Sequence, residues 1–278
     1  MDRREFVKTA GTATAALAVP GRANWLMRDR IDKIGLQLYT VRGLMKTSVE
    51  RTLSQVAAIG YKEVEFAGYF NRPPRSIRQL LDDNGLGSPS AHIGLDALRG
   101  PWNRTLSDAS EIGHKWLVIA SATKADVDSP DAIKRTADLI HKAADDAKFY
   151  KIRLAYHNHD MEFQQVGGKR IFDQLLELTK PSELQIEMDL YWITKGGGDP
   201  LDYFKRWPGR FPLVHVKDAG PAPDYPMEDV GSGTIKWATI FSHQKEAGIK
   251  HYFVERDDAP DPIASITASY KYLRALQF

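Results

Sequence analysis

The sequence predicts an α/β protein folded as one (β/α)8 barrel, the TIM barrel arrangement, and three observations favour it over the alternatives. Short apolar runs alternate with amphipathic segments eight times between residues 31 and 278. The repeats take about 245 residues together, which is the usual length of such a barrel. No glycine-rich dinucleotide fingerprint follows the first apolar run, and this argues against an open doubly wound sheet.

The first half of the barrel region contains four strand–helix units. Gly60, Gly85 and Gly113 stand where glycine commonly ends a helix, and Ser129 followed by Pro130 is typical of a helix start. Short apolar runs bounded by polar clusters are typical of buried strands. The predicted strands are 34–38, 63–66, 88–93 and 116–120, and the predicted helices are 48–58, 76–83, 105–112 and 130–150.

The second half repeats the pattern four more times, and no linker or low-complexity segment interrupts it. Asp199-Pro200 and Asp261-Pro262 each open a helix, and Pro181 follows the end of another. The predicted strands are 154–156, 184–189, 213–216 and 252–255, and the predicted helices are 171–178, 199–207, 235–247 and 261–276. Residues 31–278 are therefore expected to form a single domain.

Composition indicates an ordinary globular protein and excludes several functions. Hydrophobic residues make up 42% and charged residues 27% of the 278 residues, and the formal net charge is +2. Acids and bases are interleaved, so no basic face indicates a nucleic-acid partner. The chain has no cysteine, which excludes disulfides, thiolate metal ligands and a cysteine nucleophile, and which suits an oxidising compartment.

Residues 1–23 are expected to be a targeting segment outside the fold. Arg3, Arg4, Phe6 and Lys8 match the Arg-Arg-x-Phe-x-Lys pattern of a twin-arginine export signal, which the segment resembles. The weakly apolar run that follows is too short to span a bilayer. The alternative is an amphipathic first helix. The resemblance predicts export to the periplasm, and no membrane association once the signal is removed.

The candidate active site lies where the predicted strands end. Barrel enzymes build their active sites at the C-terminal ends of the strands, and strands five to eight are neighbours in the ring. The sequence RLAYHNHDMEF, residues 153–163, ends the fifth strand in two imidazoles and two carboxylates. Histidine and carboxylate without sulfur suit Mn²⁺, Mg²⁺, Co²⁺ or Zn²⁺. The candidate residues at strand ends are Glu65, His92, His157, His159, Glu162, Asp189, His215, Asp218 and Glu255.

With Asp in DLYW, His in HVKD and Glu in VERD, the chain resembles the xylose isomerase-like barrels, also called the sugar phosphate isomerase/epimerase family. In that family one divalent metal ion is held by Glu on strand five, Asp on six, His on seven and Glu on eight. The resemblance implies Asp189, His215 and Glu255 as ligands. Strand five differs, because His157 stands where the family has Glu. We expect Glu162 as the fourth ligand because a carboxylate preserves the charge, with His157 as the alternative.

A second departure follows strand six, where Trp192 replaces a histidine that the family often has. This replacement suggests an aromatic floor for a sugar ring, although core packing is equally compatible with it. The pattern YHNHDxEF, together with GGGDP and VGSGTIKW, resembles a branch of the family in which many members carry export signals.

The resemblance implies a metal-dependent sugar isomerase or epimerase that takes a proton from the carbon beside a carbonyl and forms a metal-bound enediolate. Glu162 and Glu255 are the candidate bases, with His157 or His159 as partner. Lys217 is the candidate for stabilising the developing oxyanion. The remaining candidates for substrate binding are Glu65, His92, Trp192 and Asp218, of which Asp218 is equally suited to capping the loop that follows it.

Two alternatives remain open at this point. One is a lyase or hydratase that acts on a keto-sugar or inosose, for example a 3-keto-glycoside. Export favours it, because phosphosugars are scarce in the periplasm, and no concentrated Arg/Lys set marks a phosphate site. The other is a non-catalytic sugar-binding barrel. In each case the expected partner is a small carbohydrate, and a homodimer is compatible with the sequence.

Overall fold

The computed structural model describes residues 29–278. The expected export signal, residues 1–23, lies outside the described residues, so its function stays a prediction. Within the described part the two ends meet, because Asp29 and Phe278 exchange backbone hydrogen bonds of 2.8 and 3.1 Å.

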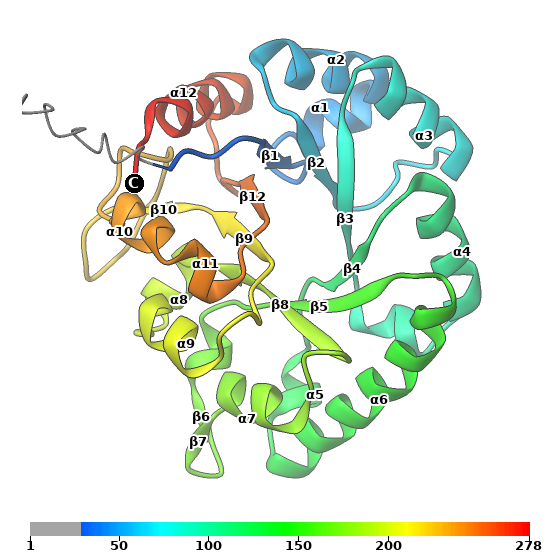
Figure 1. Cartoon of the computed structure of the whole chain (residues 1–278), viewed down its shortest axis with the longest axis vertical. Helices are drawn as coiled ribbons and strands as arrows, with labels where there is room; N and C mark the ends of the chain where they lie inside the picture. Colours follow the sequence, from blue (N-terminus) through cyan, green and yellow to red (C-terminus); the bar gives the residue numbers. More distant parts are fainter. Residues whose placement is uncertain (1–28) are drawn as a thin grey trace, which may run out of the picture.

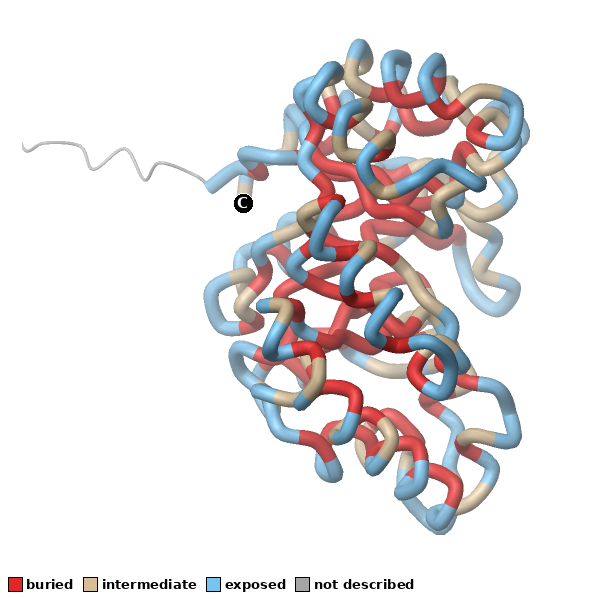
Figure 2. Tube along the Cα trace, turned by 90° about the vertical axis from the view of Figure 1, so that its right-hand side faces the viewer, coloured by how far each residue is buried: buried red, intermediate tan, exposed pale blue. Residues whose placement is uncertain are grey.

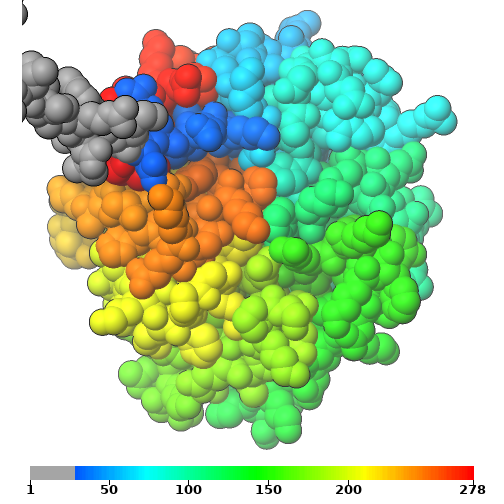
Figure 3. All heavy atoms as spheres, viewed as in Figure 1, coloured from blue at the N-terminus to red at the C-terminus, as the bar shows by residue number. Residues whose placement is uncertain are grey.

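Eight parallel strands close into a barrel, which confirms the predicted (β/α)8 TIM barrel fold (Figure 1). The strands are β1 (Ile34–Gln37), β2 (Glu63–Phe66), β3 (Gly87–Ile93), β4 (Trp116–Ile119), β5 (Arg153–His157), β8 (Leu184–Asp189), β9 (Leu213–Val216) and β12 (His251–Val254). Each strand pairs with the next one in this order, and the register Gly35↔Phe253 between β1 and β12 closes the ring. From blue to red, the colours in Figure 3 accordingly run in chain order round the visible face, and β1 lies beside β12.

Helices surround the barrel, and none of those in residues 29–278 is long and apolar enough to cross a membrane. The α-helices are α1 (Arg42–Thr47), α2 (Val49–Ile59), α3 (Pro74–Asp83), α4 (Trp102–Ile112), α5 (Lys124–Val127), α6 (Pro130–Phe149), α7 (Ile171–Leu178), α8 (Leu190–Lys195), α9 (Pro200–Arg206), α10 (Trp237–Ser242), α11 (Gln244–Ala247) and α12 (Pro262–Ala275). The connections also contain the 3-10 helices η1 (Leu95–Leu98) and η2 (Met161–Phe163), and two small hairpins, β6 (Gln165–Val166) with β7 (Lys169–Arg170) and β10 (Asp218–Ala219) with β11 (Met227–Glu228).

The predicted helix 235–247 is divided in the structure. It consists of α10 and α11, which meet at His243, and its first two residues precede the helix. The short helices α1, α5 and α8 were not predicted, because each has only four to six residues and shows too little periodicity to distinguish it from a loop.

The barrel interior changes from apolar to polar along its axis. Side chains of a strand alternate between its two faces, so every second residue of each strand points inward. Val118, Ala155, Leu213 and Phe253 belong to a small buried apolar cluster on this inward face. The residues nearer the C-terminal strand ends on the same face are polar. Figure 2 shows that the barrel strands are buried along most of their length. The outward faces pack against the helices and form the main core.

Candidate metal centre and active site

A cavity of about 470 Å³ opens at the C-terminal end of the barrel. Its charged and imidazole lining comes from the loops and strand ends of half the ring, namely His92, His157, His159, Lys217, Glu255 and Asp257. The position matches the general rule that barrel active sites are built from the loops after the strands. Tyr39, in the loop after β1, lies at the same cavity and is partly exposed.

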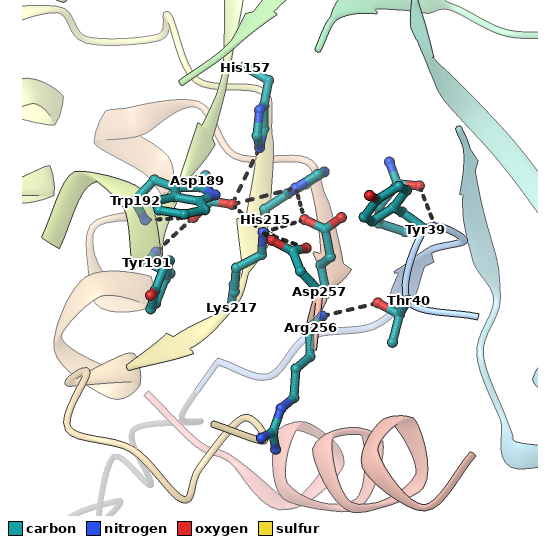
Figure 4. Close-up of polar contacts among 12 residues, drawn as sticks. Tyr39, Thr40, His157, Asp189, Tyr191, Trp192, His215, Lys217, Arg256 and Asp257 are labelled. Carbon is teal, nitrogen blue, oxygen red and sulfur yellow. Dashed lines mark hydrogen bonds and ion pairs between the residues drawn. The ribbon is translucent and has the colours of Figure 1, made fainter. Parts of the chain in front are cut away.

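Four buried side chains at this end form what we call the outer group: His157, Asp189, His215 and Glu255. They come from β5, β8 and β9 and from the residue directly after β12, so four neighbouring strands each supply one. One potential ligand atom from each lies within 4.8 Å of the others. Figure 4 shows His157, Asp189 and His215 converging on one point, which Lys217 also reaches.

The orientation of His157 suits a metal ligand. Its Nδ1 lies 3.1 Å from the carbonyl oxygen of Ala120, which can only accept, so Nδ1 carries the proton. Burial lowers the pKa of His157 to about 3, and the ring is therefore neutral. The lone pair on Nε2 then faces Asp189 Oδ2 at 3.3 Å. Two acceptors that face each other at this distance are stabilised by a cation between them, so the donor set fits a divalent metal.

The two carboxylate oxygens of Asp189 have different partners, one in helix α8 and one in the candidate site. Its Oδ1 caps α8 by accepting hydrogen bonds from the backbone N–H groups of Tyr191, at 2.9 Å, and Trp192, at 2.8 Å. Its Oδ2 faces His157 and His215. Burial works against ionisation, but Lys217 and His215 hold the pKa of Asp189 well below its usual range. The carboxylate is therefore charged and held in a fixed orientation.

Lys217 is a buried cation beside the outer group. Its Nζ lies 2.8 Å from Glu255 Oε2, 3.3 Å from Asp189 Oδ2 and 3.0 Å from Asp257 Oδ1. Burial disfavours the ammonium, but Asp189, Glu255 and Asp257 raise the pKa of Lys217 above its ordinary value. Lys217 therefore remains charged where the cavity meets the candidate ligands. Asp257 was not singled out from the sequence, although it stands two residues after Glu255.

A second set of four residues lies beside the first, and we call it the inner group: Glu65, His92, Glu187 and His215. His215 belongs to both groups, because its Nδ1 lies 2.9 Å from Glu255 Oε2 while its Nε2 lies 2.9 Å from Glu65 Oε1. His92 lies 2.6 Å from Glu187 Oε2, and although burial opposes its charge, Glu65 and Glu187 raise its pKa to about 10. Glu65 was expected to bind substrate, but it is fully buried and is not part of the cavity lining.

Glu187 was missed in the sequence, although a signal for it was present. It stands two residues before Asp189 on β8, so the alternation of the strand places both side chains on the inward face. It is fully buried and touches His92 and His215. A buried glutamate on the same face as a candidate ligand is a pattern that sequence can reveal.

Glu162, the expected strand-five ligand, belongs to neither group among the described residues. It lies in η2, where its Oε1 accepts a hydrogen bond of 2.7 Å from the Tyr156 hydroxyl and its Oε2 accepts one of 2.8 Å from the backbone N–H of His159. Glu162 thus holds the loop after β5 in place. The structure brings the alternative, His157, to the outer group instead.

Asp218 and Trp192 lie beside the site but are not part of the cavity lining. Asp218 is fully buried and accepts hydrogen bonds from the backbone N–H groups of Ala219, Gly231, Gly233 and Ile235 and from the Trp237 indole. It therefore anchors the loop, which is the second of the two roles considered for it. The Trp192 ring packs 5.3 Å from His159 and lies 5.5 Å from Lys217 Nζ.

Among the residues that the structure describes, His159 is the histidine of the cavity lining that belongs to neither group. Burial lowers its pKa, so the ring is neutral and able to accept a proton. Glu255 is less suited to that task, because it is paired with Lys217 and His215, and these charges hold its pKa below its usual range although burial opposes them. The site therefore offers a set of candidate ligands with a neutral imidazole beside it.

Known proteins with the same architecture share this arrangement of strands. A solved sugar phosphate isomerase/epimerase from Parabacteroides distasonis ATCC 8503 superposes with a TM-score of 0.77 at 28% identity, covering 88% of this chain and 98% of that one. The IOLI protein, whose structure has a binding zinc atom, superposes with a TM-score of 0.71 at 14% identity, covering 88% of this chain and 99% of that one. The second likeness shows the fold alone.

Among curated proteins the chain is similar to an inosose dehydratase from Lacticaseibacillus casei, at 23% identity in an alignment 195 positions long that covers 62% of this chain. The match spans 64% of the length of that relative. The family model of the xylose isomerase-like TIM barrel matches residues 53–276, which is most of the chain and almost all of the barrel. The chain belongs to the xylose isomerase-like TIM barrel family.

Proposed function

We propose that the protein is a divalent-metal-dependent enzyme that moves a proton on the carbon beside the carbonyl of a keto sugar, as an isomerase or epimerase. The observation that carries this proposal is the outer group, in which the neutral His157 turns its lone pair toward the ionised Asp189 beside His215 and Glu255. A bound Mn²⁺, Mg²⁺, Co²⁺ or Zn²⁺ would supply Lewis-acid polarisation of the substrate oxygens there.

Three residues of the chain account for proton transfer, charge stabilisation and positioning. His159 accepts the proton from the carbon, since it is neutral, lines the cavity and is in neither group of candidate ligands. Lys217 donates a hydrogen bond to the negative charge that develops on the substrate oxygen. Glu162, which holds the loop that bears His159, positions this imidazole through the backbone hydrogen bond of 2.8 Å.

The substrate that suits this cavity has no phosphate group. Lys217 is the sole lysine or arginine in the lining that the structure describes, and three carboxylates already surround it. A phosphate dianion would have no free cation to bind there and would meet Glu255 and Asp257. A neutral keto sugar or cyclic ketone avoids this repulsion.

A second candidate function is a dehydratase or lyase, in which the same proton abstraction is followed by loss of a leaving group. Asp257 favours it as the candidate group for passing a proton to the departing oxygen, because it lines the cavity and because burial and the neighbouring Glu255 raise its pKa above the ordinary value. The similarity to an inosose dehydratase supports the same reading.

Proton exchange in D₂O tests the proposal. The protein is loaded with each of the four metals and incubated with unphosphorylated keto sugars and inososes, and deuterium at the carbon beside the carbonyl is followed by NMR. We expect metal-dependent exchange that falls by roughly 10²–10⁴-fold in His159→Gln. Exchange with a rearranged sugar selects the isomerase or epimerase, exchange with a released group selects the lyase, and exchange that is unaffected by metal removal contradicts the proposal.

We also propose export through the twin-arginine route, which the pattern around Arg3 and Arg4 supports. The double substitution Arg3→Lys with Arg4→Lys is expected to keep the protein in the cytoplasm of a host with this route. Cell fractionation measures the outcome, and periplasmic delivery equal to that of the unchanged chain would contradict export by this route.

A further inference from the structure

We propose that the inner group, Glu65, His92, Glu187 and His215, binds a second divalent cation. Of these four residues, the resemblance to the family implies only His215 as a ligand. The others come from β2, β3 and β8, and Glu187 lies deeper in the barrel than Asp189 on the same strand. The site would therefore be additional to the one at which chemistry is proposed.

The geometry of four facing atoms is the first support. Glu65 Oε1 lies 3.1 Å from His92 Nε2 and 2.9 Å from His215 Nε2. Glu187 Oε2 lies 2.6 Å from His92 Nε2 and 3.1 Å from His215 Nε2. The two ring nitrogens, His92 Nε2 and His215 Nε2, can carry one proton each. At most two N–H groups are therefore available for the four close N–O separations. A central cation would satisfy all four atoms at once.

The separations also suit a four-coordinate ion. Ligands at about 2.0–2.1 Å from a tetrahedral Zn²⁺ lie about 3.3 Å from each other. The four N–O separations in the inner group are between 2.6 and 3.1 Å, and all four atoms lie within 4.8 Å. Outward shifts of a few tenths of an ångström would bring them to this spacing. Two nitrogens and two oxygens without sulfur form a donor set that Zn²⁺ or Co²⁺ accepts.

Charge is the second support. Glu65 and Glu187 are both fully buried, and within residues 29–278 neither forms an ion pair with a lysine or arginine. Their second oxygens, Glu65 Oε2 and Glu187 Oε1, have no hydrogen-bond partner in the part of the chain that the structure describes. Buried carboxylates are stable when paired or bound to metal. One divalent cation matches the charge of the two carboxylates and lets His92 bind as a neutral ligand.

Neighbouring groups orient the proposed ligands, and the cavity gives an ion access to them. The Gln37 amide donates a hydrogen bond of 2.6 Å to Glu65 Oε1, and the backbone N–H of Tyr39 donates one of 3.1 Å to Gln37 Oε1. Such outer hydrogen bonds orient the ligands of metal sites. His92 lines the cavity with its side chain 12% exposed, which gives the ion an entrance. With both groups filled, His215 would face one ion through each ring nitrogen as an imidazolate, its last N–H proton having been released to solvent.

Metal stoichiometry tests the inference without any substrate. The full protein is stripped with a chelator, saturated with Zn²⁺ and dialysed, and its zinc is measured by mass spectrometry. We expect two ions per chain. Glu187→Gln and His92→Gln are each expected to retain one, and so is Asp189→Asn, the matched variant in the outer group. Circular dichroism confirms that each variant is folded.

Anomalous scattering from crystals of the unsubstituted protein at the zinc edge provides a readout that needs no variant. A peak between Glu65, His92 and Glu187 supports the inference. A peak at the outer group alone, with one ion per chain that Glu187→Gln does not change, overturns the inference and leaves the proposed function intact. A peak at the inner group alone supports the inference and removes the basis of the proposed function.

Discussion

At the scale of single residues, the site depends on which side chain replaces the strand-five glutamate of the family. The sequence left His157 and Glu162 as alternatives, and among the described residues the loop after β5 places His157 in the outer group and Glu162 outside it. In that loop η2 turns Glu162 toward Tyr156 and the backbone of His159. No local pattern reports such a contact, because a 3-10 helix of three residues has no usable periodicity.

This arrangement predicts different effects of substitution at the two positions. His157→Ala should weaken divalent metal binding at the outer group by at least about 10–100-fold, the loss seen when even an outer hydrogen-bond partner of a ligand is removed. Glu162→Gln should bind the metal nearly as tightly as the unchanged chain, because Glu162 contacts Tyr156 and the backbone of His159 and lies outside the outer group. Isothermal titration calorimetry with Mn²⁺ measures both, and the reverse order of affinities would show that Glu162 is the ligand.

At the scale of elements, the long connection from β9 to α10 is organised by one buried carboxylate. Asp218 accepts hydrogen bonds from backbone N–H groups at both ends of the loop. A Cβ atom added at Gly233 would collide with Asp218 Oδ1. The motif VGSGTIKW, which the sequence showed only as a resemblance, is therefore in part a set of hydrogen-bond donors for Asp218.

Removing this anchor should cost stability. Asp218→Ala leaves several buried N–H groups without an acceptor, and we expect a loss of about 3 kcal/mol in the free energy of unfolding. Asp224→Ala, in the exposed part of the same connection, is the matched control and should change it by less than about 0.5 kcal/mol. Urea unfolding followed by circular dichroism compares the two, and equal effects would contradict the anchoring role.

Strand positions could be predicted better than helix boundaries for a physical reason. Each barrel strand is a short apolar run that is buried on both faces, so its composition stands out, and the predicted bounds for β2, β8 and β9 agree with the structure. The break between α10 and α11 at His243 has no glycine or proline to mark it in the sequence. Glu187 was not predicted because it stands inside its strand, two residues before the end, although the alternation of the strand places it on the same face as Asp189.

At the scale of the whole molecule, a buried histidine makes stability depend on pH. His114 is 1% exposed, with its Nδ1 donating to the Ser88 carbonyl at 2.8 Å and its ring stacked on Tyr69. Burial lowers the pKa of His114 to about 4, below the value of about 6.5 expected in the unfolded chain. The unfolded state therefore binds more protons between these two values.

Stability should consequently fall as the pH drops from about 6.5 to about 4, by up to about 3 kcal/mol from this residue, and its contribution should be complete above pH 6.5. His114→Gln removes the titration and should flatten this part of the profile. Urea unfolding of both proteins at pH 7, 5.5 and 4.5, in the presence of a chelator, measures the difference. Parallel pH profiles would show that His114 contributes nothing.

The backbone hydrogen bonds between Asp29 and Phe278 make the barrel suitable for circular permutation. Because the two residues already lie in contact, a short glycine-serine linker can join them without straining the ring. New termini can then be opened at the exposed turn Gly167-Gly168 between β6 and β7, away from both groups of candidate ligands. Such a circular permutant should keep every strand pair of the barrel while beginning and ending beside the loop that carries His159.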